Sequence, residues 1–213
     1  MATNIPHVAD LRDKNYTVAG YLATVNTNGR KLLQRNWGHG CIGNQGMSSQ
    51  CTAFATWGML QAHPKPLAVE DIPAPEDIYA WCQAQPGEAA SAGVYDRTIL
   101  DYLRKSGLIK AYYWSQDHSS QQALLDECVA ALLYVGPVIA FMRWPAAEPV
   151  GGKIINAGGI VGDHAVLLVG VEMERGLIYG VNSYGEKWGD RGTFTISFRT
   201  LSELLVRAIA AVK

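Results

Sequence analysis

The chain has 213 residues, of which 48% are hydrophobic and 17% charged, and its formal net charge is −1 at pH 7. This length and composition fit one globular domain, which can be divided into two lobes, and argue against intrinsic disorder. The sequence contains no strongly basic stretch and no apolar run of about 18 residues, so neither a nucleic acid nor a membrane is expected as a partner.

The N-terminus and the cysteines bear on the cellular location. Residues 1–6 lack a basic segment followed by an apolar one, so no secretory signal is expected. The four cysteines form no Cys-x-x-Cys pair, which disfavours a zinc ribbon or a thioredoxin motif; they are Cys41, Cys51, Cys82 and Cys128. We therefore predict reduced thiols in a cytoplasm, a host cytoplasm if the chain is viral, with Cys128 as a buried core thiol.

Helical signals dominate the first half of the chain. Before them, residues 18–37 are interpreted as a β-hairpin, because Asn28-Gly29 readily adopts the positive φ angles of a tight turn. A polar, Gly-rich loop is expected over residues 38–50. Apolar periodicity and the positions of Pro and Gly then predict helices over about 51–62, 76–83, 98–105 and 121–134.

After Gly136-Pro137 the pattern changes to short apolar runs that are typical of strands. Strands are predicted over 138–142, 165–171, 176–182 and 192–198, with a fifth candidate over 206–212. Helices crowd one half of the chain and strands the other. This order indicates an α+β fold with two segregated layers rather than alternating βαβ units.

A glutamine six residues before a cysteine is the first sign of chemistry. Cys51 lies where the loop becomes a helix, and a helix N-terminus favours the thiolate that a cysteine nucleophile needs. Gln45 could aim its amide at an oxyanion. The alternative is chance, because loops are rich in Gln, Gly and Ser.

His164 is the strongest candidate for the base that such a cysteine requires. It lies in Gly162-Asp163-His164-Ala165-Val166, at the start of a predicted strand. The remaining histidines lie in turns, in loops or near the N-terminus; they are His7, His39, His63 and His118. His39 is close to Cys41, but two ligands do not make a metal site.

Asn182 follows His164 by eighteen residues and begins the segment Asn182-Ser183-Tyr184-Gly185. Its side-chain carbonyl could fix the tautomer and the ring plane of an imidazole. Tyr184 and Trp188 could keep water away from that hydrogen bond. Taken singly, a structural histidine and a Gly-rich turn with core aromatics would also explain these two motifs.

Taken together and in this order, three blocks of the sequence resemble papain-like cysteine peptidases. The blocks are Gln45-Gly46…Cys51-Thr52-Ala53-Phe54, Asp163–Gly170 and Asn182-Ser183-Tyr184-Gly185…Trp188-Gly189…Gly192. Weaker matches at residues 5–12, 102–107 and 136–138 extend the resemblance over most of the chain. The chain resembles a bacterial or viral type of member, because no inhibitory pro-region precedes the mature-like start.

Three features of the sequence depart from the family's pattern. Thr52 stands where many members have Trp, and Tyr184 replaces another Trp of the family. Residues 47–50, Met-Ser-Ser-Gln, replace the usual Cys-Gly-Ser, so the disulfide that the family forms at this loop is absent. A bulkier loop therefore lies beside Cys51, where a substrate has to fit.

The resemblance implies an α+β, papain-like two-lobed fold, with a helical left lobe, an antiparallel β-sheet or barrel-like right lobe and the active-site cleft between them. A single peptidase domain would span residues 1–213. Its mainly helical lobe would comprise about residues 1–12 and 38–135, and its mainly β lobe about residues 136–213. Residues 18–37 would be a hairpin insertion, which could bind a protein partner or simply add packing.

The resemblance also implies roles for individual residues. Cys51 would attack a peptide carbonyl, with His164 as general base and then general acid, and with Asn182 orienting His164. The Gln45 side chain and the Cys51 backbone N–H would form the oxyanion hole. The residues that would bind substrate or shield the site are Asp163, Tyr184, Trp188 and Gly93.

The expected partner is a protein or peptide substrate, and neither a metal nor a cofactor is expected. Two other functions stay open. An amidase, isopeptidase or transpeptidase could use the same machinery, because the chemistry up to the acyl-enzyme is shared. A catalytically silent binding or structural protein could keep the fold alone; the intact catalytic positions argue against it, whereas the altered loop and the missing pro-region argue for it.

Overall fold

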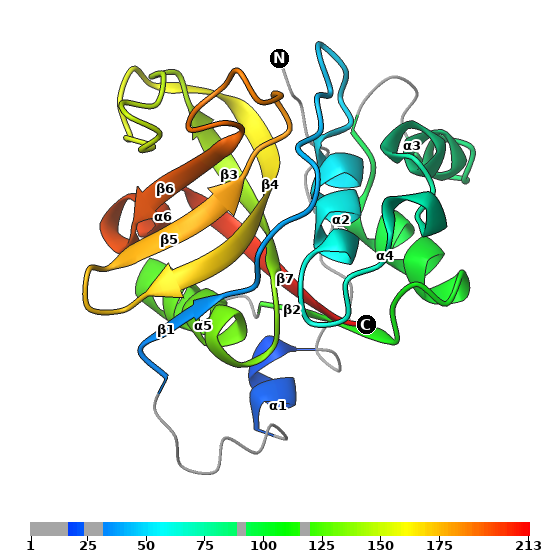
Figure 1. Cartoon of the computed structure of the whole chain (residues 1–213), viewed down its shortest axis with the longest axis horizontal. Helices are drawn as coiled ribbons and strands as arrows, with labels where there is room; N and C mark the ends of the chain where they lie inside the picture. Colours follow the sequence, from blue (N-terminus) through cyan, green and yellow to red (C-terminus); the bar gives the residue numbers. More distant parts are fainter. Residues whose placement is uncertain (1–16, 24–31, 89–92, 116–119) are drawn as a thin grey trace.

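The structure of the chain, a computed structural model, describes residues 17–23, 32–88, 93–115 and 120–213. Its helices are α1 (Val18–Leu22), α2 (Cys51–Gln61), α3 (Pro75–Gln83), α4 (Asp96–Lys105), α5 (Gln121–Tyr134) and α6 (Phe198–Leu204), with a 3₁₀ turn, η2, at Val69–Asp71. Its strands are β1 (Gln34–Asn36), β2 (Ala111–Trp114), β3 (Val138–Pro145), β4 (Ile160–Glu172), β5 (Leu177–Val181), β6 (Thr193–Ser197) and β7 (Leu205–Val212). Figure 1 shows most of the twisted sheet on one side and helices α2, α3 and α4 on the other.

The strands form one antiparallel sheet in the order β2-β7-β3-β4-β5-β6. β3 pairs with one edge of β4 as far as Leu168. β1 continues along the same edge and pairs with residues 170–172 of β4. Residues 167–172 of β4 therefore have a neighbouring strand on each edge, whereas residues 160–166 pair with β3 alone. The segregation of helices from antiparallel strands confirms the predicted α+β class.

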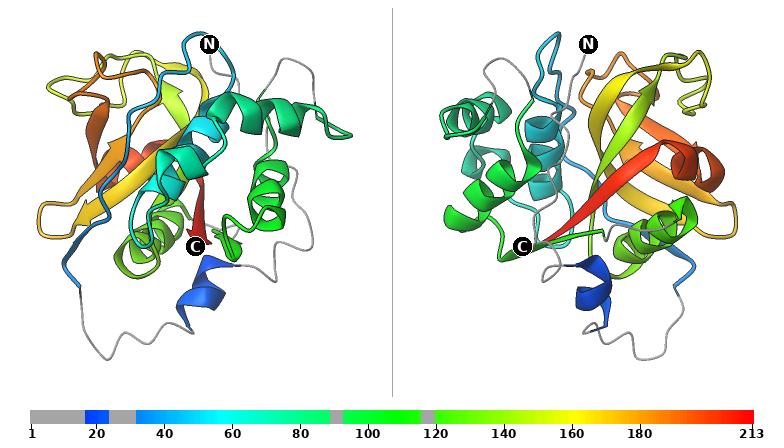
Figure 2. Two further views of the ribbon diagram at one scale, coloured as in Figure 1. Left: turned by 45° about the vertical axis from the view of Figure 1, so that its right-hand side comes forward. Right: turned by 180° about the vertical axis from the view of Figure 1, so that it is seen from behind.

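Alternate side chains of the sheet enter two different cores. In β3, Val138, Ala140 and Met142 belong to a core shared with α5, whereas Ile139 and Phe141 belong to a core shared with α2. Successive side chains of a strand point to opposite faces, so the continuous apolar run of β3 is buried on both. Helix α5 packs against β7, and the view from behind in Figure 2 shows the two side by side.

Helix α2 is buried on nearly all sides, because it packs against β4 and β3 on one side and against α3 and α4 on the other. A side chain at Gly58 would approach Leu167 of β4 to 3.2 Å, so this position needs a small residue. Lys213 Nζ donates to two backbone carbonyls in the last turn of the helix, at 3.1 and 3.3 Å. These contacts fix the helix that begins with Cys51.

The predicted hairpin over residues 18–37 is wrong. Residues 18–22 form α1: the Thr17 hydroxyl caps the helix by accepting from the Gly20 amide at 3.0 Å, and the Ala19 amide donates to Glu127 of α5 at 2.8 Å. β1 pairs with β4 instead of with residues 18–22. Residues 18–22 thus form a helix against α5 instead of the first strand of a hairpin, and Asn28-Gly29 lies outside the described residues.

The border between the lobes also differs from the prediction at α5. Leu124, Leu125 and Leu132 lie in the core on the face of the sheet opposite α2. Helix α5 therefore packs with the β lobe although it falls within residues 38–135. The other predicted helices and the strands after residue 136 are confirmed, with shifts of a few residues at their ends. β2 and α6 had no counterpart in the prediction, and residues 1–12 lie outside the described ranges.

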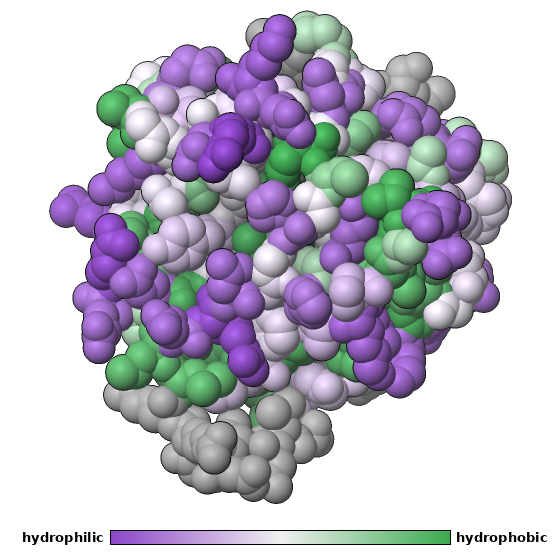
Figure 3. All heavy atoms as spheres, viewed as in Figure 1, coloured by the Kyte–Doolittle hydropathy of each residue, from purple (hydrophilic) through white to green (hydrophobic). Residues whose placement is uncertain are grey.

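The surface of the molecule is mixed in character. In the view of Figure 3, hydrophilic side chains surround several smaller hydrophobic patches. Met47, in the loop before Cys51, is 90% exposed. Within the described parts of the chain, no helix combines the length and the hydrophobicity needed to cross a membrane.

One buried ion pair joins α4 to β7. Asp96, the first residue of α4, contacts the guanidinium of Arg207 in β7, and the two side chains are only 4% and 11% exposed. The guanidinium also lies 4.9 Å from the ring of Phe141 and 5.4 Å from that of Trp114. Removal of one partner would leave a buried charge without its counter-charge, which costs much more than the pair itself contributes.

We therefore expect Asp96→Ala to lower the free energy of unfolding by about 3–5 kcal/mol, measured by urea denaturation. The matched control is Asp190→Ala, which removes an exposed carboxylate 3.8 Å from Arg191 and should have little measurable effect. A loss below about 1 kcal/mol in Asp96→Ala would show that water or other groups solvate Arg207 in the folded protein.

Candidate active site

Cys51 lies at the N-terminal end of α2 and is only 1% exposed. Burial raises the pKa of its thiol, and backbone hydrogen bonds from Ala165 and Thr52 oppose this effect in part. Ala165 follows His164 directly in β4. The contact with Ala165 therefore places the thiol beside the strand that carries the predicted base.

His164 is fully buried and hydrogen-bonds through Nε2 to Asn182 Oδ1 at 2.7 Å. The Ser183 amide donates to the same oxygen at 2.8 Å, which fixes this atom as an acceptor. Nε2 must then carry a proton, and in the neutral ring Nδ1 is left as an acceptor. Among the described residues, Nδ1 is buried without a hydrogen-bond partner.

The charge states of Cys51 and His164 follow from their burial. Burial lowers the pKa of His164 to about 4, although the hydrogen bond with Asn182 acts in the opposite direction. Because the pKa of Cys51 is raised, both side chains are neutral near pH 7 when each is considered alone. The pair thus combines a protonated thiol with an imidazole that can accept a proton.

Gln45 is held against the loop that carries Asn182. Its backbone amide donates to the Ser183 carbonyl at 2.8 Å, and its side-chain Oε1 accepts from Ser183 Oγ at 2.5 Å. Its Nε2 donates one hydrogen to the Ser48 carbonyl at 2.6 Å. An amide nitrogen carries two hydrogens, so a second N–H remains for a ligand.

Aromatic rings surround the imidazole of His164. Tyr184 stacks on it, with centroids 4.9 Å apart and an interplanar angle of 28°. Trp188 meets Tyr184 edge-on at 5.7 Å. Burial, with a contribution from the nearby Cys51, raises the pKa of Tyr184 to about 12. Tyr184 therefore lies against His164, and Trp188 lies against Tyr184.

The two other predicted site residues lie differently. Asp163 is exposed on β4 and is paired across the sheet with Arg143 of β3. Gly93 is buried before α4, where its carbonyl accepts from Gln83 of α3 at 3.2 Å. Their contribution to substrate binding stays a prediction.

Sequence reasoning missed two residues at this site. Ser183 was part of the Asn182 motif, but its hydrogen bond to Gln45 depends on how two distant loops meet. Trp144 contacts His164 with centroids 4.7 Å apart. Its signal was the alternation Val138, Ala140, Met142, which continues to Trp144 beyond the predicted end of the strand at residue 142.

The remaining cysteines differ from Cys51 in their surroundings. Cys41 is exposed, whereas burial raises the pKa of Cys82 and Cys128 to about 12 each. The full burial of Cys128 confirms its prediction as a core thiol. Within the described residues, no group of three or more His, Cys, Asp or Glu side chains could hold a metal ion.

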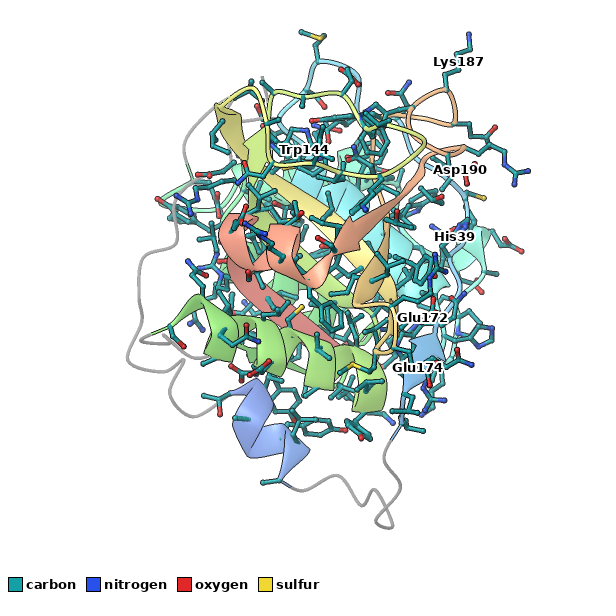
Figure 4. The ribbon with its side chains drawn as sticks, turned by 90° about the vertical axis from the view of Figure 1, so that its left-hand side faces the viewer. His39, Trp144, Glu172, Glu174, Lys187 and Asp190 are labelled. Atoms are coloured by element: carbon teal, nitrogen blue, oxygen red, sulfur yellow. The ribbon has the colours of Figure 1, made fainter. Side chains whose placement is uncertain are left out.

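A surface pocket of about 450 Å³ lies beside Trp188, between the loops at residues 148–152 and 187–190. Glu148 and Asp190 bring negative charge to it, and Lys187 brings positive charge. Figure 4 shows Lys187 and Asp190 at the outer edge of the molecule, with Trp144 deeper inside.

The sequence matches no protein-family model and no curated protein. The fold is similar to that of xylellain, a cysteine protease from Xylella fastidiosa, with a TM-score of 0.74 and 18% identity over 99% of this chain and 95% of that one. It is also similar to procathepsin L2 from the larval midgut of Tenebrio molitor, with a TM-score of 0.66 and 19% identity over 100% of this chain and 79% of that one.

A third similar structure is the Carica candamarcensis cysteine protease CMS1MS2 in complex with E-64. Its TM-score is 0.60, with 16% identity over 86% of this chain and 99% of that one. At these identities the likeness concerns the fold. The chain therefore has the papain-like α+β fold that the sequence motifs predicted.

We expect His164 to make the folded protein less stable as the pH falls. Its pKa is near 4 when folded and about 6.5 when unfolded, so between these values the unfolded chain binds a proton that the folded protein does not. Stability is unaffected above pH 6.5 and falls as the pH drops toward 4. From about pH 7 to about pH 4.5 the loss should be about 2 kcal/mol.

Urea denaturation at the two pH values measures this loss. His164→Gln removes the titrating group. Between the two pH values, the loss in its free energy of unfolding should therefore be about 2 kcal/mol smaller than the loss in the unaltered protein. His39→Gln, which replaces an exposed histidine, should behave like the unaltered protein. Equal losses in all three proteins would mean that His164 is protonated as easily when folded as when unfolded.

Proposed function

We propose that this chain, which has the papain-like fold, is a cysteine peptidase that hydrolyses peptide bonds through Cys51. The observation that carries the proposal is the buried hydrogen bond of 2.7 Å between His164 and Asn182. It directs one ring nitrogen to the amide oxygen and leaves the other, Nδ1, as a buried acceptor. The thiol contacts the next residue of the same strand, so a base and a nucleophile are available together.

In the first step, His164 Nδ1 takes the thiol proton while Cys51 Sγ attacks the carbonyl carbon of the peptide bond. Burial disfavours either charge alone, as the directions of the two pKa shifts indicate. When the thiolate and the imidazolium form together, their attraction in a low-dielectric site compensates for this cost. Asn182 Oδ1 accepts from Nε2 throughout and keeps the ring in place.

The tetrahedral intermediate carries a negative oxygen that needs donors. The second N–H of Gln45 and the backbone N–H of Cys51, at the N-terminus of α2, can supply them. The imidazolium then gives its proton to the leaving amine as the C–N bond breaks, which leaves a thioester on Cys51. A water molecule, deprotonated by Nδ1, attacks the thioester, and the products are a carboxylic acid and the regenerated thiol.

The proposed substrate is a protein or peptide, and the pocket beside Trp188 is a candidate for binding one of its polar segments. We also propose that the protein acts in the cytoplasm. Its four cysteines are free thiols, which suits a reducing compartment. Cell fractionation with detection of the protein tests this location.

The burial of Cys51 favours a second candidate, a catalytically silent binding protein on the same fold. A side chain that is 1% exposed cannot reach a substrate carbonyl unless neighbouring groups move. An amidase, isopeptidase or transpeptidase differs from the peptidase only in the bond cleaved or in the acceptor of the acyl group. Thiol labelling separates the silent protein from the enzymes, and cleavage assays separate the enzymes from one another.

We expect iodoacetamide at about pH 6 to modify Cys51 much faster than Cys41. An ordinary thiol is less than about 1% ionised at this pH, whereas His164 can take the proton of Cys51. Mass spectrometry of the alkylated peptides gives both rates in one sample, with the exposed Cys41 as internal control. His164→Ala should remove the difference. If Cys51 reacts no faster than Cys41, the silent protein is the better interpretation.

A peptide library should then be cleaved by the unaltered protein and not by Cys51→Ser. Cleavage is followed by mass spectrometry of the products. Rapid labelling of Cys51 without cleavage of any peptide would contradict the peptidase and favour an acyl-transfer enzyme with another substrate.

Gln45→Ala should lower kcat/KM by about 10²–10³-fold, the usual effect of losing one oxyanion donor. Ser183→Ala should have a smaller effect, about tenfold, because it removes only the neutral hydrogen bond that orients the Gln45 side chain. Ser202→Ala is the matched control, since its hydroxyl bonds to a carbonyl within α6. An unchanged kcat/KM in Gln45→Ala would exclude this residue from the oxyanion hole.

A further inference from the structure

Trp144 lies next to His164 because of the register of two strands. In the β3–β4 pairing, Met142 is opposite His164 and Trp144 is opposite Gly162. Residues two apart on a strand share a face, so Trp144 and His164 are diagonal neighbours on one face of the sheet, within reach of an aromatic side chain. Gly162 has no side chain that could separate them.

The three ring centroids define how the imidazole is enclosed. Trp144 lies 4.7 Å from His164 with an interplanar angle of 69°, and Tyr184 lies 4.9 Å from His164 but 6.2 Å from Trp144. Seen from His164, the two rings therefore lie in directions roughly at a right angle. Tyr184 covers a face of the imidazole, and Trp144 closes one of its sides.

The indole itself is held in place by further rings. Trp188 lies 6.1 Å from it and Phe194 lies 6.3 Å from it, and Trp144 is only 8% exposed. The ring is thus a fixed wall of the site rather than a mobile surface side chain.

We propose that Trp144 is a positioning residue for His164, which keeps Nε2 on Asn182 and Nδ1 available to Cys51 by blocking ring rotation and the entry of water. The inference rests on the proposed function and adds to it a residue outside the Cys51, His164 and Asn182 blocks. The electron-rich face of an indole also attracts a cation, so Trp144 favours the imidazolium that forms when Cys51 is deprotonated.

Other ionisable groups lie near His164 and Trp144, and replacing Trp144 does not change them. They are Cys51 of α2, Asp163 beside His164 on β4, Arg143 beside Trp144 on β3, Tyr184, Glu148, whose charge acts on Tyr184, and Tyr79 of α3, which is affected by the charge of Cys51. A change in titration caused by Trp144 must therefore act through packing, water or the indole itself.

Loss of the indole should destabilise the state in which Cys51 is a thiolate and His164 an imidazolium. The reference is the two states in which only one of these side chains is charged. The acid limb of Cys51 alkylation, where the pair forms, should then move to higher pH. Trp144→Leu should also lower the alkylation rate near pH 6, where the pair supplies the thiolate, by about tenfold.

Trp37→Leu is the matched control. Trp37 is also 8% exposed, belongs to the same core and is more remote from the site, with its indole N–H bonded to Leu132 O at 2.7 Å. It should lose stability without a shift in the pH profile. Trp144→Phe, which keeps an aromatic face, should restore most of the profile and also serves if Trp144→Leu does not fold.

A second measurement does not depend on the thiol. Hydrogen exchange of the His164 Nε2–H, followed by NMR, should be faster in Trp144→Leu and nearly unchanged in Trp37→Leu. Equal effects of both substitutions on exchange and on the pH profile, or no effect of Trp144→Leu, would overturn the positioning role. Slow alkylation of Cys51 in the unaltered protein would contradict the proposed function. The exchange rates of the His164 Nε2–H would then be the only measurement that tests whether Trp144 positions His164.

Discussion

The hydrogen bond between His164 and Asn182 is the constraint on which the site depends, and the sheet creates it. His164 lies in β4, Asn182 follows β5 directly, and the pairing of Leu167 with Val181 fixes their register. By this register the two residues are diagonal neighbours on one face. A slip of one residue would turn Asn182 to the opposite face. The same oxygen also accepts from the Ser183 amide, so the loop after β5 holds the amide in the orientation that selects the tautomer of His164.

The nucleophile reaches this pair because a second connection joins the loop before α2 to the loop after β5. The Gln45 amide bonds to the Ser183 carbonyl, and the Gly185 amide bonds to the Gly43 carbonyl. The residues that carry the proposed thiol, oxyanion donor and imidazole support are thus tied by backbone hydrogen bonds, which depend little on side-chain identity. The close packing of α2 on β4, with Gly58 against Leu167, holds the other side of the same arrangement.

Features with local causes could be predicted from the sequence. Helices α2 and α5 were found because apolar periodicity ended at Pro64 and at Gly136-Pro137, and β4 because its apolar run is long. The failures have tertiary causes. Residues 18–22 resembled a strand, but the Ala19 amide meets Glu127 and the segment becomes a helix. The resemblance to a family suggested that Cys51, His164 and Asn182 act together, whereas the contacts of Ser183 and Trp144 required knowledge of which strands and loops are neighbours.

The departure at Tyr184 can be understood from the same neighbours. Where the family that the sequence resembles has Trp after Asn-Ser, this chain has the smaller ring of Tyr184, which stacks on His164. The indole of Trp144 reaches the imidazole from the adjacent strand, over Gly162. The imidazole of His164 is thus enclosed from two elements, β3 and the loop after β5. Burial of this kind disfavours a lone charge on either Cys51 or His164, yet it strengthens their mutual attraction. The enclosure that keeps both groups neutral at rest therefore also favours a joint transfer of the proton over separate ionisation of either group.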